Sequence, residues 1–271
     1  MTGEPTSSGG LTSRRTAIVT GGTRGIGLEV ARRLARDGTN VVIAGTSATA
    51  GASALHVVAA EAQGEVCFRQ TDVGEAAEAA DLVEWTVQQF SSLDVLVNSA
   101  GVNVREGPLG PSEEQWEALF RTNATGCWWC TRSALPHLLA TRGAIVNIAS
   151  VSGLVGSAGM VGYAASKGAV IALSRSLALA HAASGLRVNV VCPGPIETEM
   201  TRASWGSLGE EEGRRRAEAM SPAARLGQVA EVAAVICFLA GPEASYVNGA
   251  VIPVDGAKSA GIMKPDRYQL P

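Results

Sequence analysis

The sequence predicts an α/β fold in which one parallel sheet is covered by helices on both faces. Short apolar runs alternate along the chain with longer segments of helical periodicity, and such strands are typical of sheets that are buried on both sides. A glycine-rich turn joins the first apolar run to the first helical segment. The 271 residues, 46% of them hydrophobic, suffice to bury the core of one large domain.

The elements follow one another in a regular order along the chain. Strands are expected at Ala17–Val19, Val41–Ala44, Val66–Gln70, Val95–Val97, Ala144–Ala149, Arg187–Val191 and Val251–Val254. A first helical pattern runs through Ile26, Val30 and Leu34, and further helices are expected at Ala48–Gln63, Ala76–Phe90, Glu113–Leu139, Gly162–Ala183 and Val229–Leu239. Residues 197–222 form a long insert that is expected to be irregular.

This order describes one domain with a tail at each end. Residues 1–13 are rich in Gly, Ser and Thr and are expected to form a disordered N-terminal tail. The domain spans residues 14–256, contains the insert at 197–222, and is followed by a C-terminal tail at 257–271. Ligands of parallel α/β sheets bind outside the carboxyl ends of the strands, and most of the motifs below fall there.

The glycine-rich turn at residues 20–27 reads TGGTRGIG and lies between a strand and an amphipathic helix. Glycine allows a tight turn and a close approach to phosphate, and the free N–H groups at the helix start attract an anion. This order therefore predicts the phosphate-binding corner of a dinucleotide fold, rather than a simple turn. The spacing Gly-x-x-x-Gly-x-Gly differs from the Gly-x-Gly-x-x-Gly of many dehydrogenases.

Tyr163 and Lys167 place a phenol and an ammonium group four residues apart in a segment that is expected to be helical. Residues at this spacing share one helix face, with Cβ atoms about 5–6 Å apart. A free phenol has a pKa of about 10, and a nearby positive charge lowers it. The pair is therefore a candidate proton donor and acceptor, the alternative being a surface tyrosine beside a solvated lysine.

Charge and cysteine content argue against several other classes of function. A net charge of −3 gives no reason to expect nucleic acid or an anionic membrane as a partner. The absence of a long apolar run and the polar N-terminus favour a cytoplasmic location. Five cysteines suggest no disulfide framework, and Cys127 and Cys130 are expected to be buried thiols within a helix. The three histidines are scattered, so no metal site is expected.

Several further motifs complete a pattern that covers nearly the whole chain, from Arg15 to Gly256. They are Asp72-Val73, Asn98-Ser99-Ala100-Gly101, Asn123, Ser150, Pro193-Gly194 and Thr198. With the glycine loop and the Tyr–Lys pair, the chain resembles the short-chain dehydrogenase/reductase family, in particular its 3-oxoacyl-carrier-protein reductase-like members. The resemblance implies a single Rossmann-type, doubly wound parallel sheet with strand order 3-2-1-4-5-6-7 and helices on both faces. It also implies an oxidoreductase that transfers hydride between a nicotinamide cofactor and a small-molecule carbonyl or secondary alcohol.

The resemblance assigns four catalytic residues. Ser150 would hold the substrate oxygen opposite Tyr163, which would act as the acid and base. Lys167 would lower the pKa of Tyr163 and bind the hydroxyls of the nicotinamide ribose. Asn123 would kink its helix and hold a water molecule that links Lys167 to solvent. Without the resemblance, Ser150 would be interpreted as a turn cap and Asn123 as a solvent-facing residue.

The resemblance also implies a set of cofactor contacts. These are Gly21, Thr23, Arg24, Gly25, Ile26, Gly27, Thr46, Asp72, Val73, Asn98, Ala100, Gly101, Tyr163, Lys167, Pro193, Gly194, Ile196 and Thr198. Asp72 would contact the adenine amino group, Asn98 would steady the adenosine pocket and Thr198 would bind the nicotinamide carboxamide. The family usually has a second Asn where this chain has Ser99, and the smaller side chain is expected to be tolerated.

The choice of cofactor is expected to be made after the second strand, where residues 43–47 read IAGTS and carry no acid. NAD enzymes of the family usually have an Asp there, which would repel a 2′-phosphate. Arg24 can supply positive charge to that phosphate, and Arg24 with Thr46 resembles the NADPH pattern of the ketoacyl reductases. NADP(H) is therefore favoured. The alternative is an NAD-dependent dehydrogenase of secondary alcohols, with Arg24 simply solvated.

Substrate specificity is expected to lie in the insert at 197–222, which could close as a lid over the nicotinamide. The candidate substrate residues are Ser152, Met200 and Trp205, and the charged part of the insert could equally be a solvated helical excursion. The sequence does not name the substrate. A nucleotide-sensing protein without catalysis is the remote alternative, which the presence of Tyr163 and Lys167 disfavours.

Assembly into a homodimer or homotetramer is also expected. Trp128 and Trp129 are adjacent on a helix and cannot both point inward. By resemblance, the helices at 113–139 and 162–183 would form a dimer interface. The segments Val229–Leu239 and Val251–Val254 would then double the dimer into a tetramer.

Overall fold

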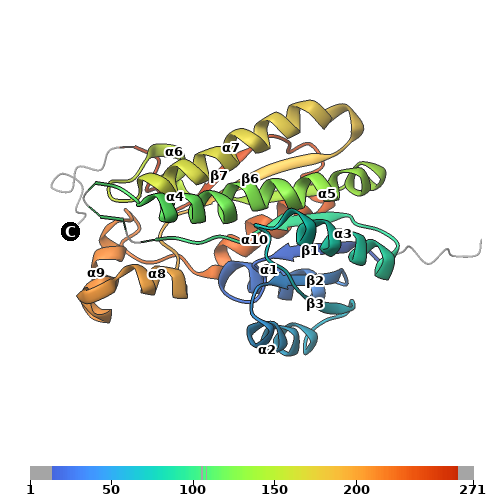
Figure 1. The fold of residues 1–271 in the computed structure, drawn as a ribbon, viewed down its shortest axis with the longest axis horizontal. Coiled ribbons are helices and arrows are strands. Elements are labelled where there is room, and N and C mark those ends of the chain that lie inside the picture. Colours follow the sequence, from blue (N-terminus) through green and yellow to red (C-terminus); the bar gives the residue numbers. More distant parts are fainter. Residues whose placement is uncertain (1–13, 105, 108, 262–271) are drawn as a thin grey trace, which may run out of the picture.

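A seven-stranded sheet forms the centre of the molecule (Figure 1). The computed structural model describes residues 14–104, 106, 107 and 109–261. The strands lie in the order β3-β2-β1-β4-β5-β6-β7, and every neighbouring pair is parallel. The fold class and strand order expected from the sequence are therefore confirmed. The predicted N-terminal tail and all but 257–261 of the predicted C-terminal tail lie outside the described residues.

The elements occur where the sequence pattern placed them, with small differences at their ends. The strands are β1 (Thr16–Thr20), β2 (Asn40–Gly45), β3 (Val66–Gln70), β4 (Val95–Asn98), β5 (Ala144–Ile148), β6 (Arg187–Pro193) and β7 (Val251–Val254). The α-helices are α1 (Gly25–Arg36), α2 (Ala48–Ala59), α3 (Ala76–Phe90), α4 (Glu113–Phe120), α5 (Gly126–Thr141), α6 (Val151–Val155), α7 (Val161–His181), α8 (Glu199–Ser204), α9 (Glu210–Ala219) and α10 (Val229–Ala240).

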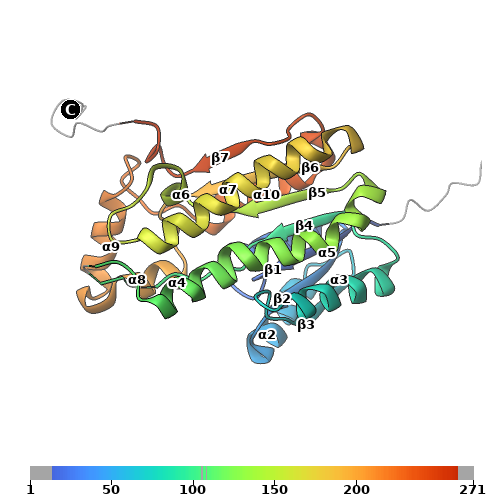
Figure 2. The same cartoon turned by 45° about the horizontal axis from the view of Figure 1, so that its top comes forward.

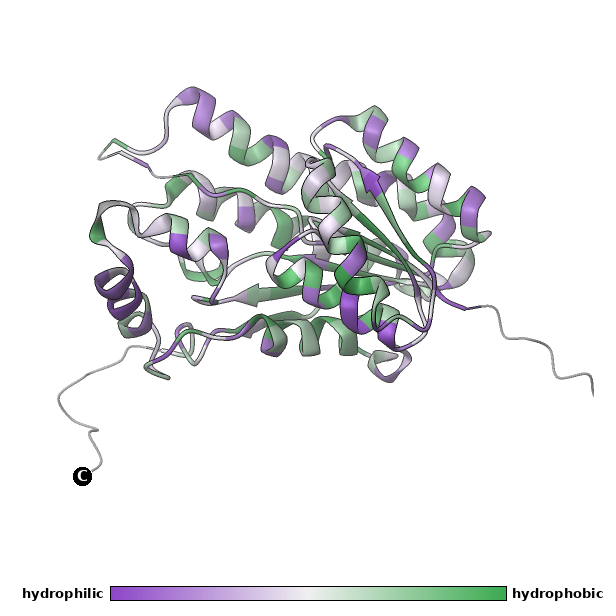
Figure 3. Ribbon diagram, turned by 90° about the horizontal axis from the view of Figure 1, so that it is seen from below, coloured by the Kyte–Doolittle hydropathy of each residue, from purple (hydrophilic) through white to green (hydrophobic). Residues whose placement is uncertain are grey.

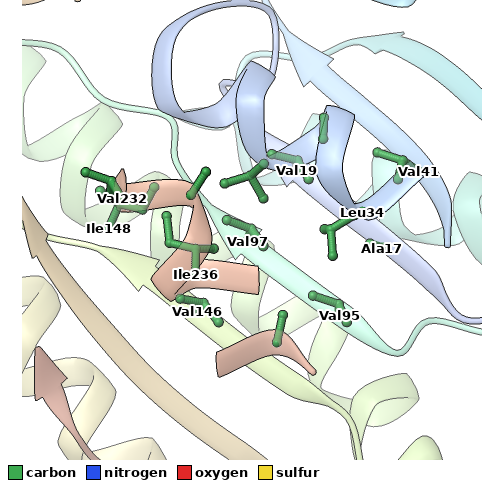
Figure 4. Close-up of a cluster of buried hydrophobic side chains, with 14 of the residues drawn as sticks. Ala17, Val19, Leu34, Val41, Val95, Val97, Val146, Ile148, Val232 and Ile236 are labelled. Carbon is green, nitrogen blue, oxygen red and sulfur yellow. The ribbon is translucent and has the colours of Figure 1, made fainter. Parts of the chain in front are cut away.

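Helices cover both faces of the sheet because successive strand residues point to opposite sides. In β1, Val19 joins the core beneath α1, α2 and α10, whereas Ile18 joins the core beneath α3, α5 and α7 (Figure 2). Figure 4 shows the first of these cores, in which Val232 and Ile236 of α10 lie over the central strands. Figure 3 shows the strands as mostly hydrophobic, with polar residues on the outer faces of the helices. Complete burial of each large aliphatic side chain stabilises the fold by about 1.5–3 kcal/mol.

The helix predicted over Glu113–Leu139 is interrupted. A π-helical turn at Arg121–Thr125 separates α4 from α5 and includes Asn123. Such turns contain one extra residue and are frequent at functional sites. The interruption lies where the family resemblance implied a kink.

The insert at 197–222 is not irregular, which corrects the sequence expectation. It contains α8 and α9, joined by a short 3-10 turn at Gly206–Leu208. Within α9 only Gly213 and Ala217 are buried, so the helix lacks the apolar stripe by which periodicity is recognised. Three glutamates in its first turn and ion pairs such as Glu212–Arg216 at 2.6 Å stabilise it instead.

Among the described residues, no helix combines the length and apolar character needed to cross a membrane.

Candidate active site

The glycine loop between β1 and α1 packs directly against the chain that leaves β4. Gly21 has a φ of +61°, and a Cβ there would lie 2.7 Å from Cα of Ala100. A Cβ on Gly27 would overlap the carbonyl oxygen of Gly21, so both positions require glycine. The Oγ1 of Thr20 accepts hydrogen bonds of 3.2 Å from the backbone N–H groups of Ser99 and Ala100. These contacts fix the loop at the carboxyl edge of the sheet.

The start of α1 fits the phosphate groups of a dinucleotide. Arg24 is its N-cap residue, and within the described chain its side chain makes no capping hydrogen bond and the first turn contains no acidic residue. The first N–H groups of a helix have no partner within the helix, and the end carries partial positive charge. Gly25, with a φ of +54°, and Ile26 present this end beside the loop. The site is therefore built to attract an anion.

Gly101 brings the cofactor loop and the predicted catalytic residues together. It directly follows Ala100, against which the glycine loop packs. A Cβ on Gly101 would lie 3.4 Å from Nζ of Lys167 and 3.3 Å from Oδ1 of Asn123. The chain that leaves β4 thus lies between the loop after β1 on one side and residues of the π-helical turn and α7 on the other. Two sets of residues that were predicted separately from the sequence therefore lie side by side.

Asn123 is buried, not solvent-facing. Its Oδ1 accepts a hydrogen bond of 2.8 Å from the N–H of Val102, and its Nδ2 donates bonds of 3.0 Å to the carbonyl of Val102 and to Oγ of Ser166. Ser166 Oγ in turn donates to the carbonyl of Tyr163 at 2.8 Å. The amide therefore ties the chain after β4 to the helix that carries Tyr163.

Lys167 is buried, and its charge is only partly compensated. Its Nζ donates a hydrogen bond of 2.8 Å to the carbonyl of Ile148 and lies 5.9 Å from the centre of the Tyr163 ring. Burial lowers the pKa of Lys167 to about 8, against the opposing influence of the nearby thiols of Cys127 and Cys192. A charged ammonium at neutral pH is thus held here at an energetic cost.

The phenol of Tyr163 does not show the shift expected from the sequence. Burial raises the pKa of Tyr163, and the hydrogen bond with Ser150 opposes this rise without reversing it. The expectation that Lys167 lowers this pKa toward neutrality is therefore wrong for this structure, because desolvation of the phenolate dominates. At neutral pH the phenol is protonated.

Ser150 stands opposite Tyr163 at the start of α6. It is the N-cap residue of that helix, and its Oγ accepts a hydrogen bond of 3.1 Å from the N–H of Ser152. The hydroxyl thus serves as a turn cap and as a partner of the phenol at the same time. Ser152, one of the candidate substrate residues, is buried in the same helix.

Asp72, the residue expected to contact adenine, takes part in an ion pair. Arg121 of the π-helical turn lies 2.8 Å from Asp72 and 2.6 Å from Glu75. Partial burial would raise the pKa of Asp72, but hydrogen bonds from Arg121 and from the N–H of Gly74 hold it below its usual value. Val73 is buried, and a Cβ on Gly126 would lie 2.7 Å from its Cγ2.

The side chain of Asn98 is buried and makes hydrogen bonds within the core. Its Nδ2 donates to Oδ1 of Asn147 at 2.9 Å and to Oγ1 of Thr131 at 3.1 Å. Asn147 continues this buried network by donating to Oγ of Ser174 at 2.8 Å. The network joins β4, β5, α5 and α7 beside the expected adenosine pocket.

The chain after β6 lies against the glycine loop. A Cβ on Gly194 would lie 2.7 Å from Cα of Asp255, so the turn that begins at Pro193 packs closely on the end of β7. Ile196 is buried, and Thr198 caps α8 through a hydrogen bond of 3.2 Å from the N–H of Thr201. A Cβ on Gly25 would lie 3.6 Å from Cγ2 of Thr198.

The residues expected to choose the cofactor lie at the end of β2. Thr46 is exposed, and a Cβ on Gly45 would lie 2.9 Å from Cγ2 of Thr23. Arg24 is also exposed, with one guanidinium nitrogen 3.4 Å from a carboxylate oxygen of Glu199 on α8. No local pattern predicts this pair, because its members are 175 residues apart.

The two hydrophobic candidates in the insert have different surroundings. Met200 is exposed on α8, but Trp205 is buried with Ala217 and Leu226 in a small core that the insert forms with the chain just after it. Glu197 ties the insert together, since it accepts hydrogen bonds from Arg202, Arg214 and Gln228. Met200 is therefore open to a ligand, whereas Trp205 stabilises the insert.

Cys127 and Cys130 are buried free thiols within α5, as expected. Burial raises the pKa of Cys127 to about 12 and that of Cys130 as well. In the part of the chain that the structure describes, no three His, Cys, Asp or Glu side chains gather as a metal site.

Comparisons with known proteins identify the family of the chain. A family model described as enoyl-(acyl carrier protein) reductase matches residues 21–257. Meso-2,3-butanediol dehydrogenase of Serratia marcescens is 37% identical over 251 residues, which are 93% of this chain and 97% of the relative. A 3-oxoacyl-(acyl-carrier-protein) reductase of Staphylococcus aureus is 38% identical over 244 residues, or 89% and 97% of the two chains.

Solved structures show the same similarity. The crystal structure of levodione reductase superposes with a TM-score of 0.87 at 32% identity, covering 92% of this chain and 98% of its own. A structure of an actinorhodin polyketide ketoreductase with NADPH superposes with a TM-score of 0.85 at 34% identity, covering 90% and 97%. The chain therefore belongs to the short-chain dehydrogenase/reductase family, whose nicotinamide-dependent oxidoreductases interconvert carbonyls and alcohols.

Proposed function

We propose that this protein is an NADP(H)-dependent short-chain reductase in which Tyr163 exchanges a proton with the substrate oxygen. Ser150 holds that oxygen, and Lys167 and Asn123 complete the site. The observation that carries the proposal is the convergence at Gly101, where the chain packed on the glycine loop meets Lys167 and Asn123. A phosphate-binding loop and a buried acid–base group at one site support hydride-transfer chemistry, which the bound nicotinamide would supply.

The protonation state of Tyr163 favours the reducing direction. Reduction of a carbonyl creates an alkoxide that must receive a proton, and a buried phenol with a raised pKa holds that proton at neutral pH. The Ser150 hydroxyl already meets the phenol, so a substrate oxygen could be held by both groups. In oxidation, Tyr163 would first have to lose its proton, which requires higher pH.

The residues around the glycine loop fit a dinucleotide, with NADP(H) favoured over NAD(H). The start of α1 would hold the pyrophosphate, and Thr198 would face the nicotinamide end. Arg24 would bind the 2′-phosphate, and residues 43–47 contain no acid that would repel it. The ketoreductase with NADPH among the structural relatives supports this choice.

One observation favours the alternative, NAD-dependent oxidation of a secondary alcohol. Glu199 already pairs with Arg24 at 3.4 Å, so a carboxylate competes with a 2′-phosphate for the same guanidinium. The relative from Serratia marcescens is named as a dehydrogenase of a diol. An exposed pair of this kind contributes little energy, and for this reason we keep NADP(H) as the first choice.

A homotetrameric or homodimeric assembly and a cytoplasmic location are part of the proposal. Leu179 on α7 and Phe238 on α10 are exposed in the single chain, and each lies on an element of an expected interface. The five cysteines are all free, as is usual for proteins of a reducing compartment.

The decisive experiment is a titration with NADPH and with NADH, followed by turnover assays. The substrate panel would contain ketones, ketoacyl thioesters, sugars and polycyclic alcohols, because no residue of the site names the substrate. Tighter binding of NADPH together with reduction of at least one carbonyl would support the proposal. Tighter binding of NADH with turnover of alcohols alone would favour the alternative.

A further inference from the structure

The helix that carries the candidate acid begins without a cap of its own. The N-cap residue of α7 is Met160, whose side chain makes no capping hydrogen bond, and the first turn contains no acidic residue. This helix has 21 residues, and Tyr163 is the third. The unpaired N–H groups of a helix start need acceptors, and their partial positive charge favours an anion.

The carboxylate of Glu106, from a loop that is distant in the sequence, accepts hydrogen bonds from the first N–H groups of α7. Glu106 accepts hydrogen bonds from the N–H groups of Val161 at 2.6 Å, Gly162 at 2.8 Å and Tyr163 at 3.4 Å. Bonds from backbone N–H groups to a carboxylate are stronger than neutral ones. One side chain therefore holds the backbone of three successive residues, including the backbone of Tyr163 itself.

The same loop reaches the other catalytic residues. From Gly101, which lies against Lys167, the chain passes to Val102, which Asn123 holds by two hydrogen bonds, and then to Glu106. Glu106 thus continues a series of contacts between the loop after β4 and the candidate catalytic groups. The series ends at the helix start that fixes the position of the phenol.

Packing around Gly162 limits how the helix start can sit. A Cβ there would lie 2.8 Å from Cδ1 of Leu119, 3.0 Å from Cγ of Pro111 and 3.4 Å from Oε1 of Glu106. The absence of a side chain lets α7 approach α4 closely and lets the carboxylate reach the backbone. If Glu106 were lost, the helix start could shift and carry Tyr163 away from Ser150.

We infer that Glu106 is a positioning residue, which holds the start of α7 against the loop after β4 and so aligns the Tyr163 phenol with Ser150. The inference rests on the proposed role of Tyr163 as the acid. Misplacement of a reacting group by about 1 Å can cost about 10²-fold in rate. Glu106 touches neither substrate nor cofactor in this account, and its effect is transmitted by the backbone.

The test compares Glu106→Ala and Glu106→Gln with the wild type and with Glu114→Ala, a control that removes an exposed carboxylate from α4. We expect Glu106→Ala to lower kcat by about 10-fold or more while the Kd for NADPH changes by less than about 2-fold. The solvent deuterium isotope effect on kcat should rise, because proton transfer from a misaligned phenol becomes slower. Glu106→Gln keeps one oxygen acceptor, so its loss should be smaller, and it serves as the test if Glu106→Ala does not fold.

A second variant separates positioning from simple capping. Met160→Asp places a carboxylate at the N-cap of α7, from which it can accept a bond from the helix start. In the Glu106→Ala background we expect it to restore the melting temperature but not kcat, because it does not restore the tie to the loop. Recovery of both together would show that Glu106 is only a cap and would overturn the inference.

The proposed function is tested separately by Tyr163→Phe. If this variant loses turnover and both Glu106 variants keep kcat within about 2-fold of the wild type, the positioning inference fails and the role of Tyr163 stands. If Tyr163→Phe keeps its rate, the proposed function fails at its acid.

Discussion

The side-chain amide of Asn123 holds the backbone of Val102 by both of its polar groups, with Oδ1 accepting from the N–H at 2.8 Å and Nδ2 donating to the carbonyl at 3.0 Å. A side-chain amide offers a donor and an acceptor at this spacing, whereas an ionised carboxylate offers acceptors alone. The pair fastens the chain after β4 to the π-helical turn, and Lys167 lies against the same chain at Gly101.

The first prediction concerns this pair. Asn123→Asp should lower the free energy of unfolding by about 1–3 kcal/mol and reduce turnover. The new oxygen would face the carbonyl of Val102 and Oγ of Ser166, whose proton is already donated to the carbonyl of Tyr163. Urea unfolding and steady-state rates measure the two effects. An unchanged unfolding midpoint would contradict the hydrogen-bond assignment.

The second prediction is that Tyr163→Phe abolishes turnover and leaves cofactor affinity nearly intact. The phenyl ring keeps the packing of the buried side chain but has no proton to exchange. Fluorescence titration with NADPH gives the affinity, and single-turnover kinetics give the chemical step. A variant with a near-normal single-turnover rate would remove Tyr163 from the acid–base role.

The third prediction is a pH dependence that differs between the two directions of reaction. Burial raises the pKa of Tyr163, so the proton-donating form persists through neutral pH and is lost as pH rises through the raised value. Carbonyl reduction should therefore be constant near neutrality and fall at high pH, whereas alcohol oxidation should increase with pH. Profiles of kcat in both directions measure this. A reduction rate that falls between pH 6 and 7, about the ordinary range of histidine titration, would assign the acid to another group.

The fourth prediction is that Lys167→Met stabilises the fold while it damages function. Burial lowers the pKa of Lys167 to about 8 in the folded state, from an ordinary value of 10.5. Below about pH 8 both states carry the proton and the folded state bears the cost of the buried charge. Between the folded pKa of about 8 and the ordinary pKa of 10.5, the unfolded state binds more protons than the folded state. In this range Lys167 therefore destabilises the fold less as the pH rises.

At pH 7 the variant should therefore unfold with a free energy about 1–3 kcal/mol higher than the wild type. The gain should shrink toward pH 10.5, the ordinary value for lysine. Loss of the hydrogen bond to the carbonyl of Ile148 reduces the gain. Turnover and cofactor affinity should both fall. Denaturant unfolding at several pH values measures the effect, and a variant less stable than the wild type at pH 7 would show that this bond outweighs the buried charge.

The fifth prediction concerns the choice of cofactor. Arg24→Ala should weaken NADPH binding by about 1.5–3 kcal/mol, nearer the lower value because the side chain is 71% exposed, and should leave NADH unchanged. Gly45→Asp should also weaken NADPH binding, because it adds a negative charge that repels the 2′-phosphate. Its Cβ would lie 2.9 Å from Cγ2 of Thr23, which must move aside. Gly45→Ala is the matched control, since it meets Thr23 without adding charge. Equal effects of Arg24→Ala on both cofactors would refute the assignment.

Local patterns in the sequence predicted the sheet, its helices and the main chemical groups of the site. Val66–Gln70 and Ala76–Phe90 occur at the residues expected, because strand and helix periods are short-range signals. The pattern missed the π-helical turn, since one extra residue does not disturb a mixed apolar segment such as Glu113–Leu139. It offered a helix in the charged part of the insert only as an alternative, because the stability of α9 comes from charge rather than from an apolar stripe.

Contacts between segments that are distant along the chain could not be predicted from local sequence patterns. Glu106 and Val161, which are joined by a hydrogen bond at the start of α7, are 55 residues apart in the sequence. No local motif predicts this contact. The pKa of Tyr163 was predicted in the wrong direction for a related reason. The spacing of Tyr163 and Lys167 is visible in the sequence, but the depth at which both are buried depends on the whole fold.

The π-helical turn has a consequence for how this chain could change by insertion and deletion. A deletion of Thr122 would allow residues 113–141 to close as one continuous α-helix without the π-helical turn. Since a π-helical turn accommodates its extra residue within one widened turn, the deletion would leave α4 and α5 close to their present relative orientation. The deletion would instead remove the wide turn, in which Arg121 binds Asp72 and Asn123 binds Val102. A shortened chain of this kind would be a better helix and a poorer enzyme, and a circular dichroism spectrum would not distinguish it from its parent.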